Sequence, residues 1–171
     1  YEIHCDLSAD NFYYISRPTE IDQSTKIHPT ASIAPTGVRI GRGVEIGAHT
    51  VIESRTIVGD CCVIRHGVVL STEGFEVREV RGSRIVVPHA GGVEIGADVE
   101  IQSNTCVSRS IWGGSTRIGS RTKIDNLVHI AHGVVIGERC LIAACATIAG
   151  TTVIGDDVWV GPNATVSNGL Y

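Results

Sequence analysis

Aliphatic residues recur at every sixth position over the C-terminal third of the chain. The residue four places after each is small or apolar, and the residue directly after is small in eight of nine cases, with Asp125 as the exception. A period of six fits neither one continuous amphipathic helix nor an array of hairpins. The nine positions, which follow one another without a slip, are Ile118, Ile124, Ile130, Ile136, Ile142, Ile148, Ile154, Val160 and Val166.

This repeat is typical of a hexapeptide β-helix, in which each hexad forms one short strand and one corner. Three hexads, or about eighteen residues, close one triangular coil, and each aliphatic residue points inward against those of neighbouring coils. Coils stack at the strand spacing of roughly 4.8 Å, so residues eighteen apart lie above one another. The pattern therefore predicts an all-β fold, a left-handed parallel β-helix of triangular cross-section.

The same six-residue repeat covers most of the chain. It begins at Ile27 and continues to Leu70, with one extra residue inserted after Ile33. Residues 27–171 are therefore predicted to form the β-helix domain. Residues 1–26 lack the repeat, and we interpret them as a cap over the first coil or the remnant of a preceding domain, because an open β-helix end needs cover. This segment also holds the aromatic cluster Phe12, Tyr13 and Tyr14.

Residues 71–92 break the repeat. An insertion of about twenty residues must project from a corner of the solenoid, because the interior of a coil has no room for it. Long projecting loops are usually functional or disordered, and the apolar run 85–87 argues against disorder. We expect this loop to pack on a neighbouring subunit, to cover a substrate, or both. A second, shorter irregularity spans residues 108–117.

The composition limits the classes of function. With 171 residues, 43% of them hydrophobic, the chain has the size and apolar content of one domain. A net charge of −4 does not favour non-specific binding to nucleic acid. No apolar run is long enough to cross a membrane, and no signal peptide is visible. Because the chain starts at Tyr1 and stops within a hexad, we expect it to be a piece of a longer protein.

The six cysteines indicate a reducing compartment. None of them forms a C-x-x-C motif, and Cys62 and Cys140 fall on the small inward position of their hexads. Such cysteines serve as small core residues more often than as zinc ligands or disulfide partners. We therefore expect a cytoplasmic protein.

Three short motifs follow one another in a specific order. Gly74-Phe75 comes first, Val87-Pro88-His89 second, and the third runs from Asp125 to His132 with the form D-N-x-x-x-I-A-H. In this order they resemble the UDP-3-O-acylglucosamine N-acyltransferases of lipid A biosynthesis, and residues 27–171 resemble the β-helix domain of that family. The hexads alone are shared by many acyltransferases, so the motifs carry the resemblance.

The resemblance implies an enzyme and its assembly. It implies a homotrimer, with active sites in the clefts between subunits, that transfers an acyl group from a thioester to the amine of a nucleotide-linked amino sugar. Transfer of the acyl group to a hydroxyl instead of the amine is the alternative form of this reaction. The thioester, an acyl-CoA or an acyl-carrier-protein thioester, is a co-substrate, so no permanently bound cofactor is expected. The catalytic base of the family corresponds to His132.

The chain departs from the family in two places. The family's uridine-binding N-terminal domain is not recognisable in residues 1–26. Lipid A members carry a further Gly-His about two coils after the base, where this chain reads Ser167-Asn168-Gly169. The missing Gly-His favours a short-chain acyl-CoA donor over a long acyl-carrier-protein thioester. It argues against a lipid A substrate more than against the reaction type.

The spacing of the repeat places a partner beside His132. This histidine lies at a corner, where a neutral imidazole can accept the proton of an attacking amine and contribute about 10²–10⁴-fold to the rate. Gly150 lies eighteen residues later and is expected at the same corner of the next coil. Its N–H would be open to an oxyanion, a contribution of about 10²–10³-fold. The simpler alternatives are a solvated or interface histidine and a glycine that relaxes the corner.

Other candidates are assigned to the substrate. Phe75 and His89 on the loop are predicted substrate-binding residues, and His129, on the flat outer face, is predicted to contact substrate or the adjacent subunit. Asp125 and Asn126 could bind the sugar, or they could form an Asx turn.

The basic residues near the start of the clean repeat are the remaining candidates. Arg117, Arg121 and Lys123 could meet the phosphates of a donor or nucleotide, or they could form a charged solvated rim.

Two other classes of function compete with acyl transfer. One is a non-catalytic β-helix that serves as an assembly or regulatory module. The other is a metal hydratase of the gamma carbonic anhydrase type, suggested by the H-x-x-H of His129 and His132. Catalytic zinc needs three protein ligands, and the position of the third histidine in such hydratases is occupied here by Gly137. We therefore predict no metal site.

Overall fold

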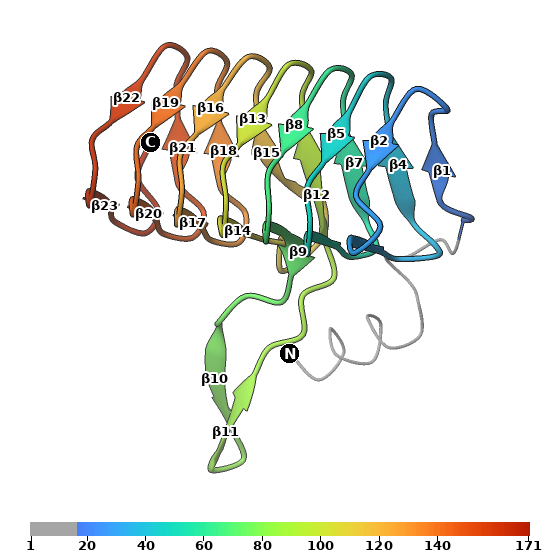
Figure 1. The fold of residues 1–171 in the computed structure, drawn as a ribbon. Helices are drawn as coiled ribbons and strands as arrows, with labels where there is room; N and C mark the ends of the chain where they lie inside the picture. Colours follow the sequence, from blue (N-terminus) through green and yellow to red (C-terminus); the bar gives the residue numbers. More distant parts are fainter. Residues whose placement is uncertain (1–16) are drawn as a thin grey trace.

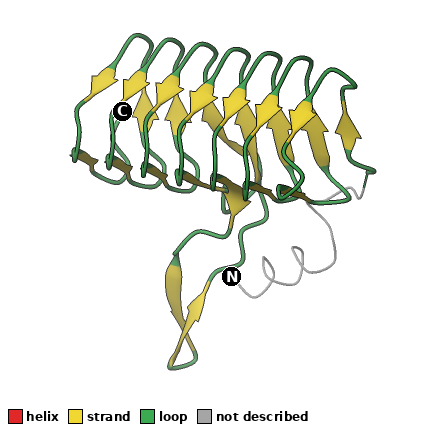
Figure 2. Ribbon diagram, viewed as in Figure 1, coloured by secondary structure: helices red, strands yellow, loops and turns green. Residues whose placement is uncertain are grey.

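Residues 17–171 of the computed structural model form a β-solenoid of short parallel strands (Figure 1). Three sheets of seven strands each run along the solenoid as its three faces, so this part of the chain contains seven coils. Over residues 17–171 the regular secondary structure consists of strands, and no helix is present (Figure 2). The predicted left-handed parallel β-helix is confirmed.

Each sheet takes one strand from every coil. Sheet 1 contains β1 (Glu20–Ile21), β4 (Val38–Ile40), β7 (Thr56–Val58), β12 (Gly92–Ile95), β15 (Ser115–Ile118), β18 (Val135–Ile136) and β21 (Val153–Ile154). Sheet 2 contains β2 (Lys26–Ile27), β5 (Glu45–Ile46), β8 (Val63–Ile64), β13 (Glu100–Ile101), β16 (Lys123–Ile124), β19 (Leu141–Ile142) and β22 (Trp159–Val160). Sheet 3 contains β3 (Ser32–Ile33), β6 (Val51–Ile52), β9 (Val69–Thr72), β14 (Cys106–Ser108), β17 (His129–Ile130), β20 (Thr147–Ile148) and β23 (Thr165–Val166).

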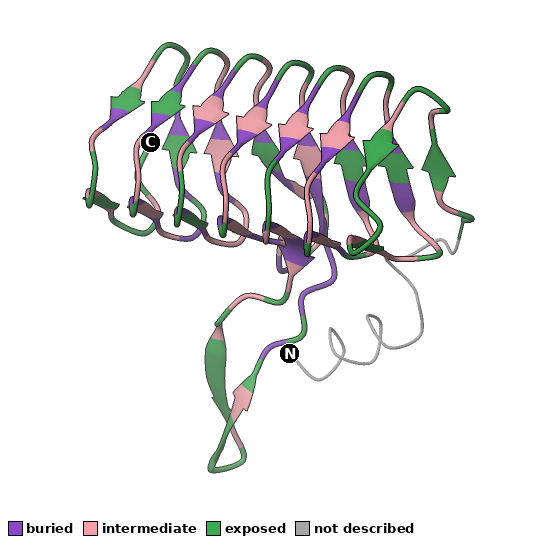
Figure 3. Ribbon diagram, in the orientation of Figure 1, coloured by how far each residue is buried: buried purple, intermediate pink, exposed green. Residues whose placement is uncertain are grey.

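The core is the column of aliphatic side chains predicted from the period of six. In sheet 2, Ile124 pairs with Ile142 and Ile142 with Val160, so the register is eighteen residues per coil. Ile124 and Ile142 are each 1% exposed, whereas Val160 is 7% exposed because it lies near the end of the solenoid, where few coils follow it. Buried residues line the inside of every central coil, while the projecting hairpin is mostly exposed (Figure 3).

Threonines at the small inward position satisfy the backbone of the corners. Thr122 is fully buried, its hydroxyl donates to the carbonyl of Gly137 at 2.9 Å, and it accepts the N–H of Cys140 at 3.1 Å. Thr152 donates in the same way to the carbonyl of Ser167. A buried hydroxyl is tolerated when it is hydrogen-bonded, so the interior accepts a threonine where a valine would also fit.

A column of glycines at the corner between sheets 1 and 2 allows the coils to approach closely. A Cβ placed on Gly137 would lie 2.6 Å from the carbonyl carbon of Gly155, far below a normal contact. The residues with positive φ lie two places later, for example Arg139 at 58°. These glycines therefore provide room for the next coil, while the turn itself is made two residues later.

The cysteines of the described residues are free thiols. Cys62 and Cys140 are fully buried, and their Sγ atoms donate to the carbonyls of Gly96 at 3.0 Å and Gly155 at 3.1 Å. Burial raises the pKa of the Cys62 thiol to about 11. The prediction that these two cysteines are small core residues is confirmed.

The solenoid begins earlier than the repeat in the sequence indicates. β1 pairs in parallel with β4, Glu20 opposite Arg39, and an isolated bridge joins Pro18 to Thr36. Part of the segment 1–26 is thus already the first strand of sheet 1, and the boundary placed at residue 26 is late for these residues. The aromatic cluster at 12–14 lies outside the described residues.

The insertion leaves sheet 3 after β9 and projects from the solenoid (Figure 1). It forms an antiparallel hairpin of β10 (Val77–Val80) and β11 (Ser83–Val86), and the chain rejoins sheet 1 at β12. The two turn residues, Arg81 and Gly82, have φ values of 50° and 77°, as expected for a two-residue turn between twisted strands. The predicted projecting loop is confirmed, while its contact with a neighbouring subunit stays a prediction.

Candidate functional site

His132 lies on the outside of the corner where β17 turns into β18. Ile130 is buried just before the corner, and Gly133 turns the backbone with a φ of 68° while its N–H donates to the hydroxyl of Thr116 at 2.9 Å. These two interactions hold the backbone on either side of His132. The side chain itself is half-buried against the next coil.

Gly150 occupies the equivalent place in the next coil. β17 pairs with β20, Ile130 opposite Ile148, and the N–H of Thr151 donates to the carbonyl of His132 at 2.9 Å. A Cβ placed on Gly150 would lie 2.7 Å from His132 Nε2. The imidazole therefore occupies the space that the missing side chain leaves, so the structure brings His132 and Gly150 together.

Two backbone N–H groups at this corner are available to a ligand. At some other corners the equivalent N–H donates to a side chain of the next coil, as Ala48 does to His66 Nδ1 at 2.9 Å and Glu138 to Asp156 Oδ1 at 2.8 Å, whereas at others, such as those of Ser120 and Ala144, it has no acceptor among the described residues. Across the described residues, the N–H groups of His132 and Gly150 have no acceptor. Two unpaired donors beside an imidazole are the elements of an oxyanion-binding site.

His89 reaches this corner from the base of the projecting loop. It is 2% exposed, and its ring lies edge-on to that of His132 with 5.5 Å between the ring centroids. Its backbone N–H donates to Glu73 Oε2 at 2.8 Å, and its Nδ1 lies 2.8 Å from the carbonyl oxygen of Val87. The loop thus places a second imidazole against His132 of the same chain.

The local environment favours a neutral His132 and an ionised Glu73. Burial lowers the pKa of His132, and the neighbouring His89 lowers it further. Burial raises the pKa of Glu73, but hydrogen bonds from the ring and backbone of His89, together with the charge of Arg109, outweigh this effect and lower it. A neutral imidazole with a free lone pair is the state that general-base catalysis requires.

Two of the predicted substrate-binding residues lie apart from the His132 corner. Asp125 and Asn126 are at the corner between sheets 2 and 3, where Asp125 Oδ1 accepts the N–H of Asn126 at 2.7 Å and Asn126 Oδ1 accepts the N–H of Ser103 at 3.1 Å. These bonds are those of the Asx turn considered from the sequence. Phe75, near the base of the hairpin, is 83% exposed.

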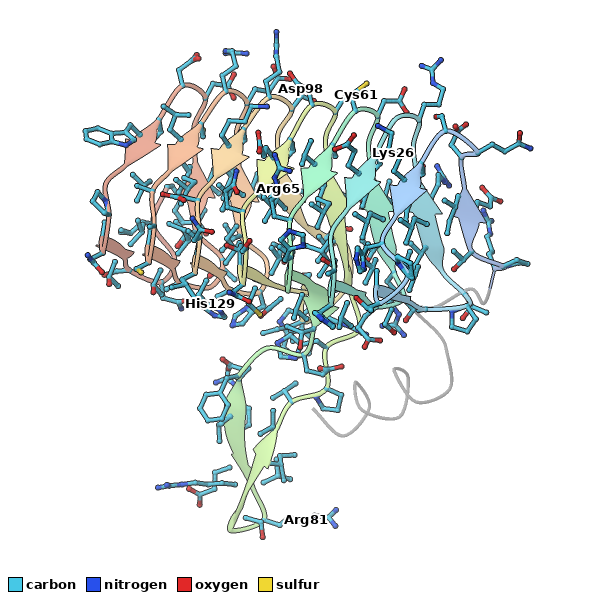
Figure 4. The ribbon with its side chains drawn as sticks, in the orientation of Figure 1. Lys26, Cys61, Arg65, Arg81, Asp98 and His129 are labelled. Atoms are coloured by element: carbon cyan, nitrogen blue, oxygen red, sulfur yellow. The ribbon has the colours of Figure 1, made fainter. Side chains whose placement is uncertain are left out.

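A further predicted substrate-binding residue, His129, is exposed on the outer face of β17, between Cys106 and Thr147 of the neighbouring strands. Figure 4 shows it at the edge of the solenoid on the side from which the hairpin projects, whereas Asp98 lies at the opposite edge.

The basic residues proposed for phosphate binding form ion pairs between coils. Arg117 lies 3.4 Å from Glu94, Arg121 lies 2.9 Å from Glu138, and Lys123 lies 3.2 Å from Asp98. Exposed pairs of this kind contribute about 0–1 kcal/mol each. Arg121 lies at the corner between sheets 1 and 2, and Lys123 lies in sheet 2. Within one chain, neither residue is therefore part of the His132 corner.

Two neighbours of the site were not predicted from the sequence as site residues. Glu73 contacts His89 directly, and both residues lie on the insertion. The insertion has no repeat, so the sequence pattern does not predict this contact. Asn168 lies over Gly150, with its Oδ1 2.9 Å from the position of a Cβ there. The spacing of eighteen residues from Gly150 to Asn168 was a signal that could have found it.

Three further observations concern other kinds of site. No group of three or more His, Cys, Asp or Glu residues within 17–171 is arranged to hold a metal ion. No helix in that range is long and apolar enough to span a bilayer. A groove of about 370 Å³ on the outer face of sheet 1, lined by residues that include Arg39, Ile57 and Gly114, does not include His132.

The repeat matches a known family model. Residues 37–72 and 115–150 match the family described as bacterial transferase hexapeptide (six repeats). These two segments lie on either side of the projecting loop and the second irregularity.

Two curated relatives carry closely similar enzyme names. A probable UDP-3-O-acylglucosamine N-acyltransferase 2, mitochondrial, from Arabidopsis thaliana is 44% identical over 110 residues, which are 64% of this chain and 36% of the relative. The UDP-3-O-acylglucosamine N-acyltransferase of Caulobacter sp. (strain K31) is 41% identical over 113 residues, 66% of this chain and 33% of the relative. The matched part is therefore about a third of the length of these relatives.

Solved structures share the fold. A UDP-N-acetylglucosamine acyltransferase structure superposes with a TM-score of 0.59 at 26% identity, covering 88% of this chain and 60% of that one. The UDP-N-acetylglucosamine O-acyltransferase of Moraxella catarrhalis gives a TM-score of 0.53 at 25% identity, covering 88% and 59%. In its two matched segments the chain is therefore similar to the bacterial hexapeptide transferases, and over about a third of their length it is similar to UDP-3-O-acylglucosamine N-acyltransferases.

Proposed function

We propose that this protein transfers an acyl group from a thioester to the amine of a nucleotide-linked amino sugar, with His132 as general base and the Gly150 N–H as oxyanion donor. The observation that carries the proposal is the position of the His132 imidazole directly over Gly150, beside backbone donors that lack an acceptor in the described chain. The enzyme names of the relatives support the reaction class.

The proposed reaction uses groups that lie together at one corner. The amine nitrogen attacks the thioester carbonyl carbon while His132 Nε2 accepts its proton. The tetrahedral oxyanion is stabilised by the Gly150 N–H, a contribution of about 10²–10³-fold for one such donor. The C–S bond then breaks, and the imidazolium returns the proton to the departing thiolate. The products are an amide and a free thiol, so atoms and charge balance.

A short-chain acyl-CoA remains our proposed donor, ahead of an acyl-carrier-protein thioester. The support is Asn168, which occupies the region where the lipid A members carry their further histidine and lies over Gly150. An amide at that place offers no positive charge to an acidic carrier protein. This part of the proposal concerns the donor only and leaves the chemical step unchanged.

A homotrimer is proposed as the assembly. Sheets 1 and 2 each present four charged residues in the outward row of their strands, whereas the outward row of sheet 3 contains no Asp, Glu, Lys or Arg. An uncharged face fits an interface core, from which charged residues are depleted. The row consists of Ser32, Val51, Val69, Cys106, His129, Thr147 and Thr165.

The experiment that tests the function is an assay of thiol release and product formation. Purified protein is incubated with acetyl-CoA or longer acyl thioesters and with nucleotide-linked amino sugars. We expect transfer by the wild type and a kcat about 10²–10⁴-fold lower for His132→Ala, with unchanged folding. His49→Asn, at an exposed corner with a positive φ that asparagine tolerates, is the matched control. Full transfer by folded His132→Ala would overturn the proposal in favour of binding or assembly.

A further inference from the structure

Two buried imidazole nitrogens at the site lack a partner. Within the described residues, His89 Nε2 and His132 Nδ1 are both buried and neither has a hydrogen-bond partner. The two rings are in contact, with 5.5 Å between centroids at an interplanar angle of 63°. An unsatisfied buried polar atom is costly, so a pair of them on touching rings indicates a function for the contact.

The tautomer of His89 follows from what faces its other nitrogen. His89 Nδ1 lies 2.8 Å from the carbonyl oxygen of Val87 and 3.2 Å from Glu73 Oε2. Both neighbours are acceptors, so Nδ1 carries a proton. In neutral His89, Nε2 then carries a lone pair and can accept a hydrogen bond.

The proposed chemistry fixes the tautomer of His132 independently. Its Nε2 lies over Gly150, where the reaction takes place, so a general base needs the lone pair on Nε2 and the proton on Nδ1. An isolated histidine favours the opposite tautomer. The Nδ1–H of His132 and the lone pair of His89 Nε2 are thus a complementary donor and acceptor on adjacent rings.

We propose that Glu73 and His89 form a positioning pair that holds His132 in its Nδ1–H tautomer and stabilises its imidazolium. The inference rests on the proposed function of His132. When Nε2 takes the proton of the amine, the positive charge is shared with Nδ1–H. No hydrogen bond joins the two rings in the described structure, so Nδ1–H donates to His89 Nε2 after a small rotation of the His132 ring, while His89 stays in place. Glu73 then lies at the far nitrogen of His89 and stabilises that charge. No proton leaves His132 by this route, so the proton still returns to the thiolate.

The surroundings hold His89 rigidly. Arg55 Nη1 donates to the carbonyl of Ala90 at 2.5 Å and to that of His89 at 3.5 Å. A Cβ placed on Gly74 would lie 2.5 Å from His89 Nε2, so the loop backbone lies directly against the ring. The segment thus offers little freedom to the imidazole, as a positioning residue requires.

A few charged and titratable groups surround His132 and Glu73. Around His132, the positive charge that His89 or His129 carries when protonated disfavours the protonated form, and Glu76 favours it. Arg109 Nη1 lies 3.8 Å from Glu73 Oε1 and offsets part of that carboxylate's charge. Glu73 is the acidic group bonded to His89, so its removal is the most direct test of the charge in the pair.

The first experiment measures the tautomer without using activity. Nitrogen-15 NMR of the histidine rings in the full chain reports which nitrogen of His132 is protonated. His89→Gln places an amide oxygen or nitrogen near the position of Nε2, whereas His89→Asn reaches only the position of Nδ1. We expect the wild type and His89→Gln to keep the Nδ1–H form of His132. His89→Asn should shift it toward Nε2–H, and the matched control His49→Asn should not.

The second experiment measures rate and pH dependence. Glu73→Gln keeps the shape of the pair and removes its charge, with Glu79→Gln on the exposed β10 as the control. We expect His89→Asn to lower kcat by about 10–100-fold with little change in KM. Glu73→Gln should move the acid limb of the kcat profile to lower pH, because the imidazolium loses a stabilising carboxylate. Partial recovery of kcat in His89→Gln is expected.

The two proposals fail in different ways. If folded His89→Asn leaves both the His132 tautomer and the pH profile unchanged, the positioning pair is overturned while His132 remains the base. If His132 is Nε2–H in the wild type, the pair is likewise overturned. Absence of acyl transfer with every donor and acceptor tried, together with an Nδ1–H tautomer that depends on His89, would overturn the enzymatic role and keep the pair.

Discussion

The imidazole of His132 lies over the Cα of Gly150, one coil further along the solenoid, and occupies the space that a side chain there would need. A Cβ at this position would be 2.7 Å from His132 Nε2. Because coils repeat at roughly 4.8 Å, a substrate carbonyl beside the imidazole also lies beside the N–H groups of the same corner. The absence of a side chain at residue 150 is therefore what leaves room for chemistry at this corner.

Gly150→Ala should lower kcat and leave the fold intact. Gly150 does not have a positive φ, so alanine causes no backbone strain, and its Cβ instead displaces the His132 ring. We expect kcat to fall by about 10²–10³-fold, measured by thiol release. Gly155→Ala is the matched control, because a Cβ there has nothing within 4 Å. Equal activity of the two variants would contradict the assigned role of Gly150.

Activity should fall in acid as His132 becomes protonated. Burial and the neighbouring His89 lower the pKa of His132, so its base form persists to lower pH than in an exposed histidine. The acid limb of kcat/KM is therefore expected below roughly 6.5, the ordinary histidine value. This acid limb is measured from kcat/KM between about pH 4.5 and pH 8, with the folding of the protein followed over the same range. An inflection above the ordinary value would mean that another group titrates.

Replacing the hairpin 77–86 by Asn-Gly should separate its roles from those of the loop base. The N–H of Val87 donates to the carbonyl of Glu76 at 2.8 Å, so the two ends are already close enough for a two-residue turn. We expect an unchanged circular dichroism spectrum and an unchanged His132 tautomer. A higher KM for the acceptor, or a trimer that dissociates on dilution, is the expected loss. If turnover and assembly are both unaffected, the hairpin has neither proposed role.

Gly137→Ala should destabilise the solenoid without touching the site. Its Cβ would lie 2.6 Å from the carbonyl carbon of Gly155, which is backbone and cannot rotate away. Overpacking of this kind costs about 1–3 kcal/mol, measured by urea denaturation. Gly155→Ala again serves as the control. A stability equal to wild type would mean that the coils can separate locally at little cost.

The period of six determined the fold, because it fixes the local geometry of every coil. Each aliphatic residue must point inward, and three hexads must close a turn, so the strands, the core and the spacing of eighteen residues all follow from one pattern. The same pattern did not place β1, since Glu20–Ile21 lies before the recognisable repeat and is held by its pairing with β4. Pairing with a neighbour is a tertiary property that a two-residue strand does not reveal by itself.

The sequence by itself also determined that His132 and Gly150 meet, because periodic stacking converts a distance along the chain into a distance in space. Only the tertiary structure decided that His89 and Glu73 join them. The insertion between β9 and β12 has no period, so its path depends on contacts with the corner on which it packs. The same reason explains the basic residues: Arg117, Arg121 and Lys123 are close in sequence, but a triangular coil distributes them over different faces, where each pairs with a carboxylate of an adjacent coil.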